Sequence, residues 1–83
     1  MIKVLYFASL RDRLDSSGEQ LDATGISDVA ALKTLLSQRQ GDWNAVFSQD
    51  ELLLCAVNQE MAQDQTSIED GDEIGFFPPV TGG

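Results

Sequence analysis

The sequence comprises 83 residues, 42% of them hydrophobic and 23% charged, which suits a single domain with one modest core. Its 14 acidic and 5 basic residues give a net charge of −9, and this excludes nucleic acid as an expected partner, because binding phosphates requires clustered lysine and arginine. No apolar run approaches the ~20 residues of a membrane span, the N-terminal residues lack a signal-peptide pattern, and the single cysteine, Cys55, cannot form an internal disulfide, so we expect a cytoplasmic protein.

The first strand is predicted over residues 2–8, because the segment is rich in β-branched and aromatic residues. Alternation along the strand separates two sets of side chains, with Ile2, Val4 and Tyr6 on one face and Lys3, Leu5 and Phe7 on the other. Since Lys3 marks the outward face, we expect Phe7 to point outward as well. A polar helical turn over 9–15 and a weaker strand over 19–23 follow.

The strongest helix signal covers residues 28–39. Ser27 suits the N-cap position, and Gly41 suits the residue just beyond the C-terminus. Apolar residues recur along one face of this helix at Val29, Leu32 and Leu36. After it, a connecting turn or short helix is predicted from the apolar residues Trp43, Val46 and Phe47.

The apolar run over residues 52–57 predicts the most buried strand. It contains Cys55, which we interpret as a structural thiol because nothing cationic lies nearby in sequence to lower its pKa. The remaining elements are a turn at 58–59, a short strand over 60–62, a turn at 70–72 and a final strand over 74–77.

Four to five strands and one substantial helix predict a two-layer α+β domain, with the first and last strands as neighbours at the centre of the sheet. One face of the sheet then packs on the helix and the other stays partly open. Three apolar residues are candidates for an exposed patch on the open face: Phe7, Met61 and Phe77. Such a patch would mark a partner site, and the alternative is that all three belong to the core.

The chain offers few groups for catalysis or metal binding. It contains no histidine, which excludes an imidazole base, a histidine metal ligand and a Ser–His pair. The densest acidic cluster, residues 69–73, surrounds a turn and lacks the ligand spacing of an EF-hand. We therefore expect no metal site, and the excess of acidic residues serves either solubility or a basic partner.

The strongest functional signal is the segment after the last strand, which consists of Pro78, Pro79, Val80, Thr81, Gly82 and Gly83. The two prolines stiffen its start and exclude a helix. The two glycines form a slim tip that can enter a narrow channel and present a carboxylate to another protein's active site. A frayed end is the alternative interpretation of the same composition.

Four segments resemble a known family in order and spacing: Tyr6–Asp12, Ala56–Gln59, Asp70–Ile74 and the ending Phe76–Gly83. They are similar to segments of the small, sulfur-carrying subunit of molybdopterin synthase, and the similarity runs along the whole chain. The resemblance implies a ubiquitin-like β-grasp domain over residues 1–77, with a mixed sheet and one main helix, and a flexible tail over residues 78–83.

The resemblance also implies a function for the Gly83 carboxylate. A ubiquitin-activating-like adenylyltransferase would adenylate it with ATP and Mg, and a desulfurase system would indirectly supply the sulfur of a thiocarboxylate. That sulfur would pass to cyclic pyranopterin monophosphate in the large subunit of a heterotetramer, where residues 78–82 are inserted. By the same resemblance, Phe7, Met61 and Phe77 contact the large subunit.

This chain would bind no cofactor and would not be a catalyst alone. Three alternatives stay open at this point: a sulfur carrier for another pathway such as thiamine, a ubiquitin-like modifier of lysines, and an interaction module with an inert tail.

Overall fold

The computed structural model describes residues 1–48 and 53–78. Eight elements follow one another in these residues: β1 (Ile2–Tyr6), α1 (Ser9–Leu14), β2 (Gly18–Leu21), α2 (Val29–Ser37), α3 (Asp42–Phe47), β3 (Leu54–Val57), β4 (Glu60–Met61) and β5 (Glu73–Phe77). None of these helices is long and apolar enough to cross a membrane.

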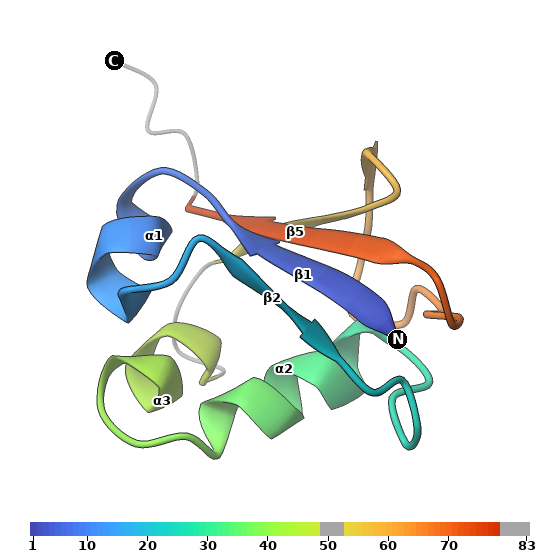
Figure 1. Ribbon diagram of the computed structural model, residues 1–83, viewed down its shortest axis with the longest axis horizontal. Coiled ribbons are helices and arrows are strands. Elements are labelled where there is room, and N and C mark those ends of the chain that lie inside the picture. The colour runs from blue at the N-terminus through green and yellow to red at the C-terminus, as the bar shows by residue number, and fades with distance from the viewer. Residues whose placement is uncertain (49–52, 79–83) are drawn as a thin grey trace.

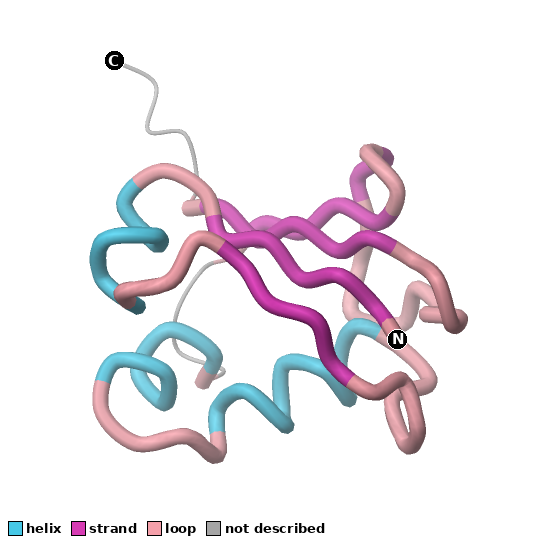
Figure 2. The backbone as a smooth tube through the Cα atoms, viewed as in Figure 1, coloured by secondary structure: helices cyan, strands magenta, loops and turns pink. Residues whose placement is uncertain are grey.

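The strands form one mixed sheet in the order β2-β1-β5-β3-β4. β1 and β5 pair in parallel, and the other neighbours are antiparallel. The prediction that the first and last strands are neighbours at the centre is therefore confirmed. Helices α2 and α3 lie on one side of the sheet, and α1 lies at one end of it (Figure 1, Figure 2), so the two-layer α+β architecture is confirmed as well.

The core lies between the sheet and α2. Every second residue of β1 is buried, as the alternation predicted: Ile2, Val4 and Tyr6 face the helices. On β5, Ile74 and Phe76 are fully buried. They meet the apolar face of α2, which consists of Val29, Leu32 and Leu36. Cys55 is buried in the same core, which confirms its interpretation as a buried thiol.

The bounds of α2 differ from the prediction at both ends. Asp28, rather than Ser27, is the N-cap, and its carboxylate accepts a 2.8 Å hydrogen bond from the Ala31 N–H. The helix ends at Ser37, whose carbonyl accepts a 2.8 Å hydrogen bond from the side chain of Asn44 in α3. Gly41, with a φ of 74°, does not close α2 but precedes α3. The Ser37 carbonyl is thus bonded to α3, and the N–H groups of the next two residues bond three residues back, to the carbonyls of Leu35 and Leu36.

The limits of three strands also differ from the prediction. β1 ends at Tyr6 because Ala8, at a φ of 55°, turns the chain into α1. β2 starts one residue early, at Gly18, and ends at Leu21. Residue 52, where the third strand was predicted to start, lies outside the described residues, and β3 begins at Leu54.

A polar cluster at the rim of the core ties three segments together. The Tyr6 hydroxyl donates a 2.8 Å hydrogen bond to Glu19 in β2. Arg39, just after α2, donates to both Glu19 oxygens at 2.8 Å and lies 4.4 Å above the ring of Trp43. Burial, followed by the hydrogen bond to Glu19, raises the pKa of Tyr6 well above its usual value near 10. The Arg39 guanidinium holds the pKa of Glu19 below its ordinary value.

Tyr6 is the only tyrosine, so its ionisation can be followed by phenolate absorbance. Because the pKa is raised in the folded state, the unfolded chain loses this proton first as the pH rises above 10, and the free energy of unfolding falls from there upward. We expect no phenolate signal near pH 10 in the native protein and an ordinary titration in denaturant. A native titration near pH 10 would contradict the burial of the hydroxyl.

Candidate functional site: the open face and the start of the tail

The sheet face that points away from the helices is here called the open face. One residue from each strand pairs across it in a single row: Gly18, Leu5, Gly75, Ala56 and Met61. Alternation places this row on the open face, because the neighbouring residues Val4 and Ile74 are core. At the middle of the row, Gly75 has no side chain and its neighbour Ala56 has a small one.

The open face is apolar at the end where the tail begins. Leu54 pairs with Phe77 there, and both side chains are partly exposed. Phe7 lies beside them, since its N–H donates a 3.0 Å hydrogen bond to the Phe76 carbonyl. Pro78 follows Phe77 directly and is partly exposed. The end of β5 therefore lies next to the turn between β1 and α1, as Figure 1 shows.

The opposite end of the open face is polar. Lys3 pairs with Gln20 of β2 on one side and with Glu73 of β5 on the other. The face thus changes from polar to apolar along the direction of β1 and β5, and the tail continues from the apolar end. A partner that binds this face would meet a polar end and an apolar end rather than a uniform surface.

The three residues that the sequence analysis proposed for partner contact all lie on this face. Phe7 is 46% exposed and Met61 67% exposed, and Phe77 is partly exposed. Met61 is on the edge strand, two strands from Gly75, which separates their Cα atoms by about 10 Å. The three residues therefore lie on one face without forming a tight cluster, and their contact role stays a prediction.

Leu54 also lies on this face but was not among the predicted contact residues. The run over 52–57 is apolar throughout, so its period does not show which of its side chains point outward. The pairing of Leu54 with Phe77 supplies that information. Of the predicted tail, only Pro78 is described; Pro79, Val80, Thr81, Gly82 and Gly83 lie outside the described residues, and the predicted boundary between domain and tail stays a prediction.

Two of the segments that carried the family resemblance meet at the polar end. Asn58 donates a 3.0 Å hydrogen bond to the Asp72 carboxylate and accepts one of 3.0 Å from the Glu73 N–H. The other Asp72 oxygen accepts a 2.8 Å bond from the Glu69 N–H, which is the main reason for the lowered pKa of Asp72. Asn58 and Gln59 have φ values of 52° and 71°, as a tight hairpin turn requires. These segments therefore hold the start of β5 next to the end of β3.

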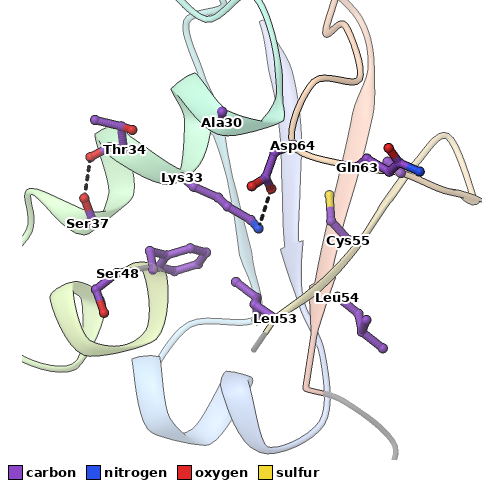
Figure 3. A pocket seen from close by; sticks show the side chains of 12 residues that line it. Ala30, Lys33, Thr34, Ser37, Ser48, Leu53, Leu54, Cys55, Gln63 and Asp64 are labelled. Carbon is purple, nitrogen blue, oxygen red and sulfur yellow. Dashed lines mark hydrogen bonds and ion pairs between the residues drawn. The ribbon is translucent and has the colours of Figure 1, made fainter. Parts of the chain in front are cut away.

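A hollow of about 760 Å³ lies between α2 and β3 (Figure 3). Lys33 and Asp64 form a 2.7 Å ion pair at its edge, and Cys55 points into it. Burial raises the pKa of the Cys55 thiol to about 11, so the thiolate that a nucleophile needs is scarce at neutral pH. Within residues 1–48 and 53–78, no three acidic, cysteine or histidine side chains are grouped closely enough to hold a metal ion.

The comparisons with known proteins assign the chain to a family, since the model of the ThiS family matches residues 4–83. The chain belongs to the ThiS family. The molybdopterin synthase sulfur carrier subunit of Escherichia coli K12 is 40% identical over 83 residues, with 100% of both chains covered. These findings confirm the family resemblance seen in the sequence.

Solved structures support the same fold. A Pyrococcus furiosus protein described as subunit 1 of a molybdopterin converting factor has a TM-score of 0.77 and 25% identity, covering 95% of this chain and 97% of that one. Small archaeal modifier protein 1 of Haloferax volcanii has a TM-score of 0.73 and 27% identity, covering 99% and 98%. The fold is the ubiquitin-like β-grasp that the resemblance implied.

The hydrogen bonds of Asn58 lead to a stability prediction. Asn58→Ala removes two side-chain hydrogen bonds and places a Cβ-bearing residue without a polar group at a positive φ, so we expect the free energy of unfolding to fall by about 1–3 kcal/mol. Asn58→Gly is the matched variant, because it relieves the φ constraint but also lacks the hydrogen bonds. Chemical denaturation measures both, and an Asn58→Ala protein of wild-type stability would show that these hydrogen bonds are not important for the fold.

Proposed function

We propose that this chain is the sulfur-carrier subunit of molybdopterin synthase. The main observation in support is that a Pro-Pro-Val-Thr-Gly-Gly segment continues from the apolar end of the open face in a ThiS-family fold. The E. coli relative, 40% identical over its full length, is a subunit with this name.

The reactive group in this proposal is the carboxylate of Gly83. An α-carboxyl has a pKa of about 3.3–3.7, so at neutral pH it is anionic and a poor electrophile. Its oxygen attacks the α-phosphorus of ATP, pyrophosphate leaves, and an acyl adenylate forms. A hydrosulfide-level sulfur nucleophile then displaces AMP and gives a thiocarboxylate. The sulfur of the thiocarboxylate attacks cyclic pyranopterin monophosphate, and water then cleaves the bond between the acyl carbon and the sulfur, which leaves the sulfur on the pterin and restores the Gly83 carboxylate.

The residues of this chain serve to deliver that group. Gly82 and Gly83 have no Cβ, which allows two different enzymes to close around the reacting carbon. The six residues 78–83, if extended, span about 20 Å, which is enough to reach a recessed site in a partner docked on the open face. The docking itself would bury the apolar end of that face, around Phe7, Leu54 and Phe77.

The partners and location follow from the same proposal. The large subunit of molybdopterin synthase and a ubiquitin-activating-like adenylyltransferase would each bind this chain in turn. The adenylyltransferase, rather than this chain, would bind ATP and Mg, and a desulfurase system would supply the sulfur. A cytoplasmic location suits a chain with one buried cysteine. The thiamine pathway uses the same terminal chemistry, but the Pro-Pro-Val segment favours the molybdopterin pathway.

The carrier function predicts a chemical change at the tail. After incubation with ATP, Mg, the adenylyltransferase and a sulfur source, intact mass should rise by the replacement of one oxygen by sulfur, confined to the C-terminal peptide. Deletion of Gly83 should abolish this gain and leave the unfolding temperature unchanged, because β5 ends at Phe77. Sulfur transfer at the wild-type rate by the deletion variant would rule out the carrier mechanism.

A second candidate function is that of a ubiquitin-like modifier, which the likeness to small archaeal modifier protein 1 favours. A modifier ends its cycle as an amide on a lysine, whereas a carrier ends it as a free carboxylate. In cells, the modifier function predicts a ladder of higher-mass conjugates that reducing agents do not remove. The carrier function predicts the free chain and its thiocarboxylate.

The proposed docking also predicts an effect of a substitution on the open face. Phe77→Ala removes a partly exposed ring at its apolar end, so the complex with the large subunit should weaken by about 1–3 kcal/mol through lost apolar burial. Leu35→Ala is the matched control, because Leu35 is 41% exposed but lies on α2. Calorimetry measures the affinity of both variants for the large subunit. Equal affinities would show that the docking surface does not include the end of β5.

A further inference from the structure

Gly75 lies at the centre of the open face and is nevertheless buried. The ring of Phe7 covers it. A Cβ added to Gly75 would lie 2.8 Å from Cε2 of Phe7, 3.6 Å from Cδ2 and 3.8 Å from Cζ. The first of these distances is shorter than carbon atoms tolerate, since non-bonded carbons prefer separations of about 3.5–4.0 Å. The Phe7 ring therefore occupies the space in which any other residue would place its side chain.

The fold itself does not require glycine at this position. Gly75 is in a strand and is not among the glycines with positive φ, so its backbone conformation suits any residue. The three atoms nearest to a new Cβ belong to the Phe7 ring. Phe7 is 46% exposed, so its ring can move outward. An alanine here would displace the ring rather than the backbone.

Gly18, in the same row of the open face, is a contrasting case. A Cβ on Gly18 would lie 2.7 Å from the Val4 carbonyl oxygen and 2.9 Å from Cδ2 of Leu5. The carbonyl oxygen is part of the central strand β1 and cannot yield without disturbing the sheet. Gly18 is therefore required by the backbone, whereas Gly75 is required only by the position of one exposed ring.

We infer that Gly75 is a positioning residue for partner docking: its missing side chain lets the Phe7 ring lie against the sheet, at the height at which the apolar end of the open face fits the large subunit. This inference rests on the proposed function. Interface cores pack as densely as protein interiors. A Phe7 ring raised by even part of an ångström would therefore hold the partner away from Phe77 and Leu54, and the contacts of these two residues would be lost. Gly75 touches neither partner nor substrate and acts through Phe7.

The test is a double-mutant cycle with Gly75→Ala, Phe7→Ala and the double variant of the full chain. Calorimetry measures the affinity of each for the large subunit, and thermal unfolding measures stability. NMR of the free proteins measures the ring-current shift of the Gly75 Hα protons, which the covering ring produces and which Phe7→Ala removes. In Gly75→Ala, the Hα shift of residue 75 reports the displaced ring independently of any partner.

We expect Gly75→Ala to fold with wild-type stability, to lose most of the ring-current shift, and to bind the large subunit about three- to tenfold more weakly. The same substitution in the Phe7→Ala background should change the affinity no further, because the ring through which it acts is gone. By contrast, Gly18→Ala should lower the unfolding temperature.

Three results would overturn the inference. One is a Gly75→Ala protein with a displaced ring and unchanged affinity. Another is an equal loss of affinity with and without the Phe7 ring, which would mean that Gly75 acts by another route. The third is a Gly75→Ala protein whose ring-current shift at residue 75 is the same as in the wild type. If the wild-type chain does not bind the large subunit at all, both the proposed function and the docking part of this inference are wrong. The NMR comparison would still show whether Gly75 determines the position of the Phe7 ring.

Discussion

The parallel pairing of β1 with β5 is the constraint on which the rest of the structure depends. It joins segments from the two ends of the chain, with Tyr6 opposite Phe76 in the core. Because the two strands are parallel, their carboxyl ends meet at one edge of the sheet. Phe7 and Phe77 therefore emerge side by side, and the tail begins beside them. An antiparallel pairing would start the tail at the polar end, next to Lys3, and separate Phe7 from Phe77 and the tail.

Two polar clusters hold the sheet at its margins, and neither lies at the apolar end of the open face. At the polar end, Asn58 and Asp72 join the β3–β4 turn to the start of β5. At the rim of the core, Glu19 joins Tyr6 to Arg39. The hydrogen bonds of Glu19 are partly buried, so a slipped register would leave their donors and acceptors unpaired, and the exposed hydrogen bonds of Asn58 hold the turn against β5. The open face can then be apolar at one end without determining the register.

The order of the elements could be predicted from the sequence because each has its own local signal, such as the alternation in β1 and the apolar stripe of α2. The helix limits could not, since Asp28 and Ser27 are equally good caps and α3 decides where α2 ends. The open face was only partly predictable. Lys3 marked its outward direction, but the covering of Gly75 by Phe7 depends on strand register, which a single sequence does not show. The motifs around Asn58 and Asp72 are evident in the sequence, but the hydrogen bond that joins them is not.

The position of β5 also has a consequence for biosynthesis. β5 lies at the middle of the sheet and is the last of the described strands to be synthesised. Chains emerge N-terminus first, so β1 and β3 have no common neighbour until residues 73–77 have left the ribosome. A prematurely terminated chain lacks the central strand, and with it both the assembled apolar surface and the attachment of the tail. Folding thus acts as a check on length, since only a chain translated through β5 can present itself to the enzymes that would load it.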